Sequence, residues 1–267
     1  MYAFVYPVSS AVVGFLCRFI LNIVHILFFI YLQIKHSKFV LLKVLYNTKS
    51  LLTDQMKQEE MENDFISKSI KQFSKLPKHL VFAIGEEKVS YNDLAQLIAW
   101  CLPTGVPVIS FYDHKDELNA DMLFDVFVKT HGDLTPSIKW GVSFNREFEY
   151  GTYGEMPCLQ VNILTSKYSR RLLIDSIKEL SHIQDIRLDD RASAEAALDD
   201  IMLSKFSYCA NPDLLVISGD CYTTFGLSPW HMGFTEFSLV PSYKLLTVND
   251  FVGVLATYAR CDQKFGR

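Results

Sequence analysis

Three groups of polar residues in this chain each follow a short apolar run that is typical of a buried strand. In an open α/β sheet, ligands bind at the carboxyl ends of the strands, in the turns that follow them. The sequence therefore offers three candidate positions for a ligand, whose chemical groups are carboxylates, hydroxyls and an imidazole. The three groups are Glu86-Glu87, Asp113-His114 and Ser218-Gly219-Asp220.

Two of these groups have a structural interpretation beside the chemical one. The carboxylates of Glu86 and Glu87 could bind a metal ion, but adjacent acids on a strand-to-helix turn are usually solvated. His114 could act as a general base near neutral pH, with Asp113 beside it. We favour a helix cap for Asp113 and a turn position for His114.

The third group opens the most informative stretch of the chain, residues 213–241. An apolar run at 214–217 predicts a buried strand that ends at the Ser-Gly-Asp group. Gly and Pro then break the chain at 226–229, and residues 230–240 are rich in aromatic side chains. This pattern predicts a second strand close to the first.

The order of residues in this stretch resembles the C-terminal signature of the cis-prenyltransferases. Ser218-Gly219-Asp220, Trp230 and Glu236 stand where that family has its Ser-Gly-Glu run, its Trp and its acidic strand residue. Ile217 and Tyr222 stand where the family has two arginines that bind the diphosphate of isopentenyl diphosphate. Neither side chain is a cation with forked donors, so the resemblance implies that diphosphate binding is lost here.

A second segment carries the same resemblance. Residues 80–84 predict a buried strand, which in catalytic cis-prenyltransferases ends in Asp-Gly-Asn-Gly-Arg-Trp-Ala. The Asp of that motif binds magnesium, and its Arg and backbone hold the allylic diphosphate. Residues 85–90 of this chain are Gly-Glu-Glu-Lys-Val-Ser. The resemblance therefore implies no catalytic residue and no metal ligand in this chain, and Mg²⁺ held by a catalytic partner subunit.

The C-terminus supplies a third point of resemblance. Heteromeric members of the family use a C-terminal Arg-x-Gly on the non-catalytic subunit to reach into the partner's active site, and this chain has Lys264, Phe265 and Gly266. Lys keeps the charge but loses the fork of Arg, and Gly leaves a backbone N–H open to close approach. We expect these three residues to bind isopentenyl diphosphate in a shared site; a frayed basic terminus is the alternative.

Residues 76–267 as a whole resemble the Nogo-B receptor family, the accessory subunits of dehydrodolichyl diphosphate synthase. The resemblance implies a required, non-catalytic subunit that pairs with the catalytic dehydrodolichyl diphosphate synthase subunit. The pair would elongate farnesyl diphosphate with isopentenyl diphosphate to make the dolichol precursor for protein glycosylation. Two alternatives stay open: a single-subunit enzyme with a phosphate site at Glu86, Glu87 and Arg170, or a membrane-anchored binding protein or receptor that only retains the fold.

Aromatic side chains crowd the short segment 225–237. At this density they either fill a core or form the centre of an interface. In the resembling family this region forms the dimer contact, so we expect it to face the partner. Glu236 within such a contact would need a cation or backbone donors from the partner, and an exposed strand position is the equal alternative. The predicted interface residues are Phe225, Trp230, Phe234, Glu236 and Phe237.

Bulk properties limit the function classes. The 267 residues suffice for one sizeable core, and the net charge of −4 argues against a nucleic-acid partner. The six scattered cysteines contain no Cys-x-x-Cys pair, which favours reduced thiols. Strands that alternate with helices predict one α/β domain over residues 65–267, with a mainly parallel central sheet flanked by helices. The resemblance implies that this fold is cis-prenyltransferase-like.

The N-terminal part predicts a membrane anchor. Residues 8–32 are almost wholly apolar, and about 22 helical residues reach the roughly 30 Å of a bilayer core, so residues 1–34 predict a transmembrane helix. Lysines follow this segment and none precedes it, which places the later residues in the cytosol. We expect residues 35–64 to form a basic juxtamembrane segment and a charged, solvated linker. The family resemblance implies that the membrane is that of the endoplasmic reticulum.

Three polar residues interrupt the apolar segment. Arg18, Asn22 and His25 are spaced to share one helical face, and an Arg near mid-bilayer costs about 2.5 to 3.5 kcal/mol on insertion scales. Snorkelling with local thinning, contact with another membrane helix, and a helix that lies in the interface are three explanations that stay open.

Overall fold

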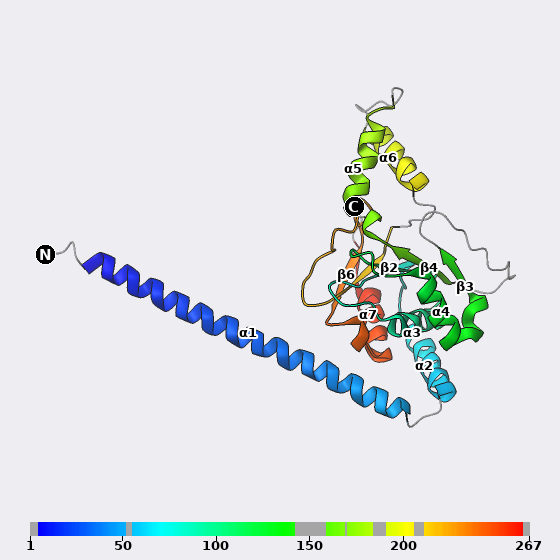
Figure 1. Cartoon of the computed structure of the whole chain (residues 1–267), viewed down its shortest axis with the longest axis horizontal. Coiled ribbons are helices and arrows are strands. Elements are labelled where there is room, and N and C mark those ends of the chain that lie inside the picture. The colour runs from blue at the N-terminus through cyan, green and yellow to red at the C-terminus, as the bar shows by residue number, and fades with distance from the viewer. Residues whose placement is uncertain are drawn as a thin grey trace. The chain divides into compact units, whose positions relative to one another are not determined.

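A computed structural model describes residues 5–51, 55–141, 159–168, 170–183, 191–205 and 211–263. The chain divides into two compact units, residues 1–53 and residues 54–267 (Figure 1).

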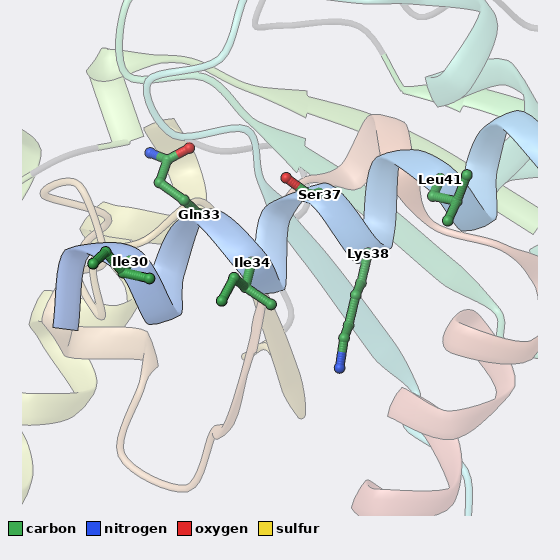
Figure 2. Close-up of a pocket in the computed structure, with 6 residues that line it drawn as sticks. All are labelled: Ile30, Gln33, Ile34, Ser37, Lys38 and Leu41. Carbon is green, nitrogen blue, oxygen red and sulfur yellow. The ribbon is translucent and has the colours of Figure 1, made fainter. Parts of the chain in front are cut away.

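The first unit contains one long helix, α1 (Val5–Leu51). Within it, Val12–Ile34 has a mean hydropathy of 2.2 and is long and apolar enough to cross a membrane, judged by length and composition. Figure 2 shows a shallow hollow on α1, where this stretch gives way to the basic part of the helix. All of the residues that line the hollow belong to α1: Ile30, Gln33, Ile34, Ser37, Lys38 and Leu41.

The second unit starts earlier than the sequence predicts. The charged run at 54–64, which we expected to be a solvated linker, lies largely in α2 (Gln55–Ile70). Glu62 of this helix is buried and accepts a hydrogen bond of 2.7 Å from the indole Nε1 of Trp100. The expected linker is wrong because one face of α2, which includes the fully buried Ile66, packs against the domain.

A six-stranded sheet of order β3-β4-β2-β1-β5-β6 forms the centre of the second unit. All of its strand pairs are parallel, which confirms the prediction of an α/β fold with a mainly parallel sheet. The strands are β1 (His79–Ala83), β2 (Val108–Tyr112), β3 (Ile138–Gly141), β4 (Leu159–Leu164), β5 (Leu214–Ser218) and β6 (Glu236–Val240).

Helices lie between β1 and β2, between β2 and β3, and between β4 and β5, as crossovers of parallel strands often do. The α-helices are α3 (Tyr91–Cys101), α4 (Ala120–His131), α5 (Arg170–Leu180), α6 (Arg191–Lys205) and α7 (Val248–Arg260). Short 3-10 turns lie at Leu102–Thr104, Gly132–Ser137, Ser166–Tyr168, Pro229–His231 and Tyr243–Leu245. A capping box of Thr247 and Asp250 begins α7, because each residue accepts a backbone N–H of the other.

The main core lies on the sheet face that packs against α2, α3, α4 and α7. Aromatic rings fill much of it: Phe82 and Phe111 have ring centroids 6.2 Å apart, and those of Phe127 and Trp140 are 5.7 Å apart. A smaller core on the opposite face joins Tyr112 to apolar residues of β1, β4 and β5. Helices α5 and α6 lie side by side and share a separate small core (Figure 1).

Candidate functional site

The carboxyl ends of β1 and β5 meet where the strand order changes direction. The chain passes from β1 to β2 on one side and from β5 to β6 on the other, so these neighbours form a topological switch point. Ligands of open α/β sheets bind in the crevice at such a point. The sequence placed its candidate turns here, and the structure brings residues 85–87 and Ser218 together.

Glu87 ties these turns to each other. Both carboxylate oxygens accept hydrogen bonds from hydroxyls, one from Ser218 Oγ and one from Ser242 Oγ at 2.6 Å. Ser218 Oγ in turn accepts the backbone N–H of Tyr243 at 2.8 Å. The carboxylate is therefore satisfied by the protein itself, and Ser218 serves as a structural anchor between β5 and the turn after β6.

Gly85 brings the turns into direct contact. Its φ is +68°, and a Cβ built on it would lie 2.4 Å from the carbonyl oxygen of Ser218 and 3.0 Å from Cζ of Phe225. An L side chain would be strained in this backbone conformation and would clash with a carbonyl that cannot turn away. The crevice between β1 and β5 is filled at this point.

Phe225 covers the same place from the loop after β5. Its ring stacks on the imidazole of His114 with centroids 4.8 Å apart and an interplanar angle of 16°. Its backbone has a φ of +50°, and its carbonyl accepts a hydrogen bond of 2.9 Å from the hydroxyl of Tyr112. Burial of that hydroxyl raises the pKa of Tyr112 to about 12, so it stays a donor at physiological pH. Phe225, predicted as an interface residue, is therefore partly used inside the domain.

Glu86 lies outside this packing, with its side chain 73% exposed. Lys115 Nζ contacts its carboxylate at 2.8 Å and also donates to its backbone carbonyl, and His114 Nε2 lies 3.1 Å from the carboxylate. The hydrogen bond from Lys115 is the main cause that lowers the pKa of Glu86, and the same bond raises the pKa of Lys115. The carboxylate is therefore engaged by Lys115 and His114 of its own chain.

Asp113 does not cap a helix as we expected. Its carboxylate accepts three backbone N–H groups in the turn after β2, from Lys115, Glu117 and Leu118, at 2.7 to 2.9 Å. The cap of α4 is Asn119, whose side chain accepts the N–H of Met122. Several residues separate the end of β2 from the start of α4, so Asp113 stabilises the turn between them and is too far from α4 to cap it.

We call these interlocked turns the closed edge, defined by Gly85, Glu86, Glu87, His114, Ser218 and Phe225. The charged groups of the closed edge next to the crevice are carboxylates, which repel a diphosphate. The neighbouring cation, Lys115, is already paired with Glu86. Among the residues that the structure describes, no group of three His, Cys, Asp or Glu side chains could hold a metal ion. At the closed edge, the carboxylates of Glu86 and Glu87 are thus both engaged by groups of this chain.

The border strand β6 has a different character. Tyr222, Phe234, Phe237 and Leu239 are 64%, 64%, 37% and 38% exposed, and we call these four residues the β6 patch. The rings of Tyr222 and Phe237 lie 6.2 Å apart, and the Tyr222 hydroxyl donates to the carbonyl of Phe237. The sequence predicted Phe234 and Phe237 in an interface but missed Tyr222 and Leu239. The outward position of Leu239 on alternate residues of an edge strand was the available signal.

Trp230, also predicted in the interface, packs within the chain. Its indole lies against the small core of α5 and α6, and Nε1 donates a hydrogen bond of 2.6 Å to Asp199 of α6. Glu236 is half-buried, and its backbone N–H pairs with the carbonyl of Asp213 beside β5.

The predicted tail residues Lys264, Phe265 and Gly266 lie outside the described residues. The last described residue, Gln263, donates from Nε2 to the carbonyl of Phe234 at 3.0 Å. The end of the described chain therefore lies beside the β6 patch.

Comparison with known proteins gives the chain its relatives. No model of a known protein family matches the sequence. The human dehydrodolichyl diphosphate synthase complex subunit NUS1 is 26% identical over 200 residues, which cover 72% of this chain and 68% of that protein. The corresponding Schizosaccharomyces pombe subunit is 22% identical over 233 residues, which cover 82% of this chain and 88% of that protein. The chain is a homologue of the NUS1 subunits.

The expected resemblance to accessory subunits of dehydrodolichyl diphosphate synthase is thus confirmed. Relatives named NUS1 also occur in mouse, at 24% identity, and in Saccharomyces cerevisiae, at 19%. Among solved structures, lavandulyl diphosphate synthase from Lavandula x intermedia superposes with a TM-score of 0.49 and 16% identity, over 72% of this chain and 99% of that one. A probable undecaprenyl diphosphate synthase from Campylobacter jejuni gives 0.47 and 14%, over 73% and 100%.

Proposed function

We propose that this chain is the non-catalytic, required subunit of a heteromeric dehydrodolichyl diphosphate synthase. The single observation that carries the proposal is the closed edge, because a NUS1 homologue whose own diphosphate site is filled by its side chains needs a catalytic partner. The complex would elongate farnesyl diphosphate with isopentenyl diphosphate to the precursor of dolichol for protein glycosylation.

Magnesium and the allylic diphosphate belong to the partner in this proposal. The residues of the closed edge do not fit a Mg²⁺ ion, because Glu87 is saturated by serine hydroxyls and Glu86 is paired with Lys115. Glu87 cannot turn toward a cation without breaking its contact with Ser218 at the end of β5, and Glu86 would have to leave Lys115.

Membrane attachment is the second part of the proposed role. Residues 1–53 contain no Asp or Glu, and every Lys of this segment follows the apolar stretch Val12–Ile34. Basic residues are retained on the cytosolic side of a membrane helix. The proposal is therefore that α1 anchors the complex in the endoplasmic reticulum membrane with the globular unit in the cytosol.

The β6 patch is the proposed contact with the catalytic subunit. Phe237 lies on the edge strand β6, and Tyr222 and Phe234 lie in the loop before it. All three are solvent-exposed in the isolated chain, and interface centres are enriched in aromatic residues. The bond between Gln263 and Phe234 supports a tail that leaves from this patch. Lys264, Phe265 and Gly266 would then extend across the contact to the isopentenyl diphosphate in the partner's site.

Isopentenyl incorporation by the co-expressed pair tests the proposal. We would compare the wild-type chain with a chain that ends at Gln263, and measure assembly on the same samples by size-exclusion chromatography. We expect activity to fall at least about tenfold while the pair still assembles, because a charge-assisted contact to diphosphate is lost. Removal of Arg267 alone is the matched control and should leave activity near wild type.

Two outcomes would contradict parts of the proposal. Full activity of the chain that ends at Gln263 would remove the tail from the shared site. A catalytic partner that is equally active without this chain would favour the alternative, a membrane-anchored binding protein or receptor.

A further inference from the structure

The apolar stretch of α1 carries a regular seam of residues with a spacing of 3.5. Arg18, Asn22, His25, Phe29 and Leu32 follow each other in steps of four, three, four and three. Such steps keep all members on one face of a helix and are the repeat of left-handed pairs of helices. The hollow shown in Figure 2 lies on a different side of α1, about 130° around the helix from this seam.

Asn22 sits at the depth where a polar group is hardest to accommodate. It lies ten residues after Val12 and twelve before Ile34, the ends of the apolar stretch, so at 1.5 Å per residue it is about 15 Å and 18 Å from them. In the hydrocarbon of a bilayer, an amide without a hydrogen-bond partner costs roughly 4 to 8 kcal/mol. The side chains of Asn22 and His25 are both exposed along α1.

Arg18 has a simpler solution. It lies six residues after Val12, about 9 Å from the end of the apolar stretch, and its long side chain can carry the guanidinium to the headgroups. Asn22 and His25 are too short to reach water in this way. Their partners must come from another helix in the membrane.

A second copy of this chain supplies matching groups at the same depth. An amide and a neutral imidazole each contain a donor and an acceptor, so each can bond to its own kind across a two-fold axis. Parallel copies have the same orientation in the membrane and therefore bring Asn22 to Asn22 and His25 to His25, while the arginines diverge toward the headgroups. An asparagine at a seam position is a known device for fixing the register of paired helices.

We infer that α1 pairs in parallel with α1 of a second copy through this seam, with Asn22 and His25 hydrogen-bonded across the pair. The inference rests on the membrane span of the proposed function. Such pairing would join two synthase complexes in one membrane, independently of the β6 patch and the tail.

Disulfide cross-linking of the full chain in membranes, co-expressed with its catalytic partner, tests this inference. Single cysteines would be placed in the seam by Phe29→Cys and Leu32→Cys, and on the opposite face by Leu27→Cys and Ile34→Cys, all in a Cys17→Ser background. That background without a new cysteine gives the adduct formed by the remaining native thiols. We expect the seam positions to form homodimer adduct at least about fivefold faster than the opposite-face controls.

The double substitution Asn22→Leu and His25→Leu then tests the polar contacts in the Phe29→Cys chain. We expect about a tenfold loss of adduct, since an interhelical hydrogen bond contributes about 1 to 2 kcal/mol in model membrane helices. Leucine favours membrane insertion, so a loss cannot be ascribed to failed anchoring. Ile23→Leu, on another face, is the matched control and should leave the adduct unchanged.

Three outcomes would overturn the inference. Equal adduct at seam and opposite-face positions would indicate random collision, and adduct that persists in the double variant would remove Asn22 and His25 from the contact. An adduct of a different mass without any homodimer would assign the seam to the helix of another protein. Loss of isopentenyl incorporation on truncation at Gln263 is independent of all three outcomes and so separates this inference from the proposed function.

Discussion

The closed edge lies at the carboxyl ends of the central strands β1 and β5, and the β6 patch lies at the outer strand of the same sheet. The side chains of the first contact each other, whereas those of the second are exposed to solvent. At the closed edge, Glu87, Ser218 and Ser242 use each other's polar groups, and Phe225 covers Gly85. At the β6 patch, large aromatic side chains stay in contact with solvent. The position where this fold ordinarily binds a ligand is thus a structural contact between turns. The exposed apolar surface lies instead at and beside the edge strand β6.

The largest effect should come from Gly85→Ala at the closed edge. The new Cβ would lie 2.4 Å from a backbone carbonyl at a positive φ, so we expect a loss of about 3 kcal/mol in the free energy of unfolding. Urea unfolding of the full chain in detergent, followed by circular dichroism, measures it. Gly253→Ala in α7 has open space around its Cβ and should be neutral or stabilising by up to about 1 kcal/mol. Equal stability of the two variants would contradict the closed edge.

A smaller loss, about 2 kcal/mol, is expected for Trp230→Ala. The sequence assigned this residue to the interface, whereas its indole packs on α5 and α6 and bonds to Asp199. Hydrogen exchange should therefore quicken in α5 and α6 before it does in the sheet, with the partner still bound. Asp199→Asn keeps an acceptor oxygen and should give a weaker version of the same pattern. Release of the partner without faster exchange would return Trp230 to the interface.

Phe237→Asp should affect assembly more than folding. The ring is 37% exposed, so we expect the melting temperature to change little, while association with the catalytic subunit weakens at least about tenfold. Co-purification and surface plasmon resonance with the purified partner would measure it. Met122→Asp on α4 changes an exposed apolar residue of another surface and is the matched control. Equal weakening by both substitutions would show that the β6 patch has no special role.

Glu86→Gln should have the smallest effect, because the pair with Lys115 is exposed to solvent. The folded-state pKa of Glu86 is lowered, so its contribution is present above the ordinary value of 4.5 and is lost as pH falls through the lowered pKa. We expect a difference in Tm of about 1 °C between variant and wild type at pH 7, which shrinks below pH 4.5. A difference that grows on acidification would contradict the assignment.

Much of the fold could be predicted because its signals are local. Short apolar runs bounded by turn residues predicted the parallel strands, and the apolar stretch before the lysines predicted a helix over residues 1–34. The structure continues this helix, α1, to Leu51, into the expected juxtamembrane segment. The packing of residues 54–64 against the domain could not be predicted, since the many charges of this run suggest that it is solvated. One carboxylate in that run, Glu62, is buried, and Trp100 of a different helix donates a hydrogen bond to it.

The candidate site likewise combines residue identities, which the sequence shows, with long-range contacts, which it does not show. Through its resemblance to the cis-prenyltransferases, the sequence indicated that the phosphate- and magnesium-binding residues of that family have other residues in their place at 85–90, 217 and 222. Only the tertiary structure decided what the replacements do. Glu87 and Ser218 are 131 residues apart in the chain, and Glu87 and Ser242 are 155 apart. Contacts over such separations depend on strand order and register, which are set by the packing of the whole sheet and leave no local pattern to read.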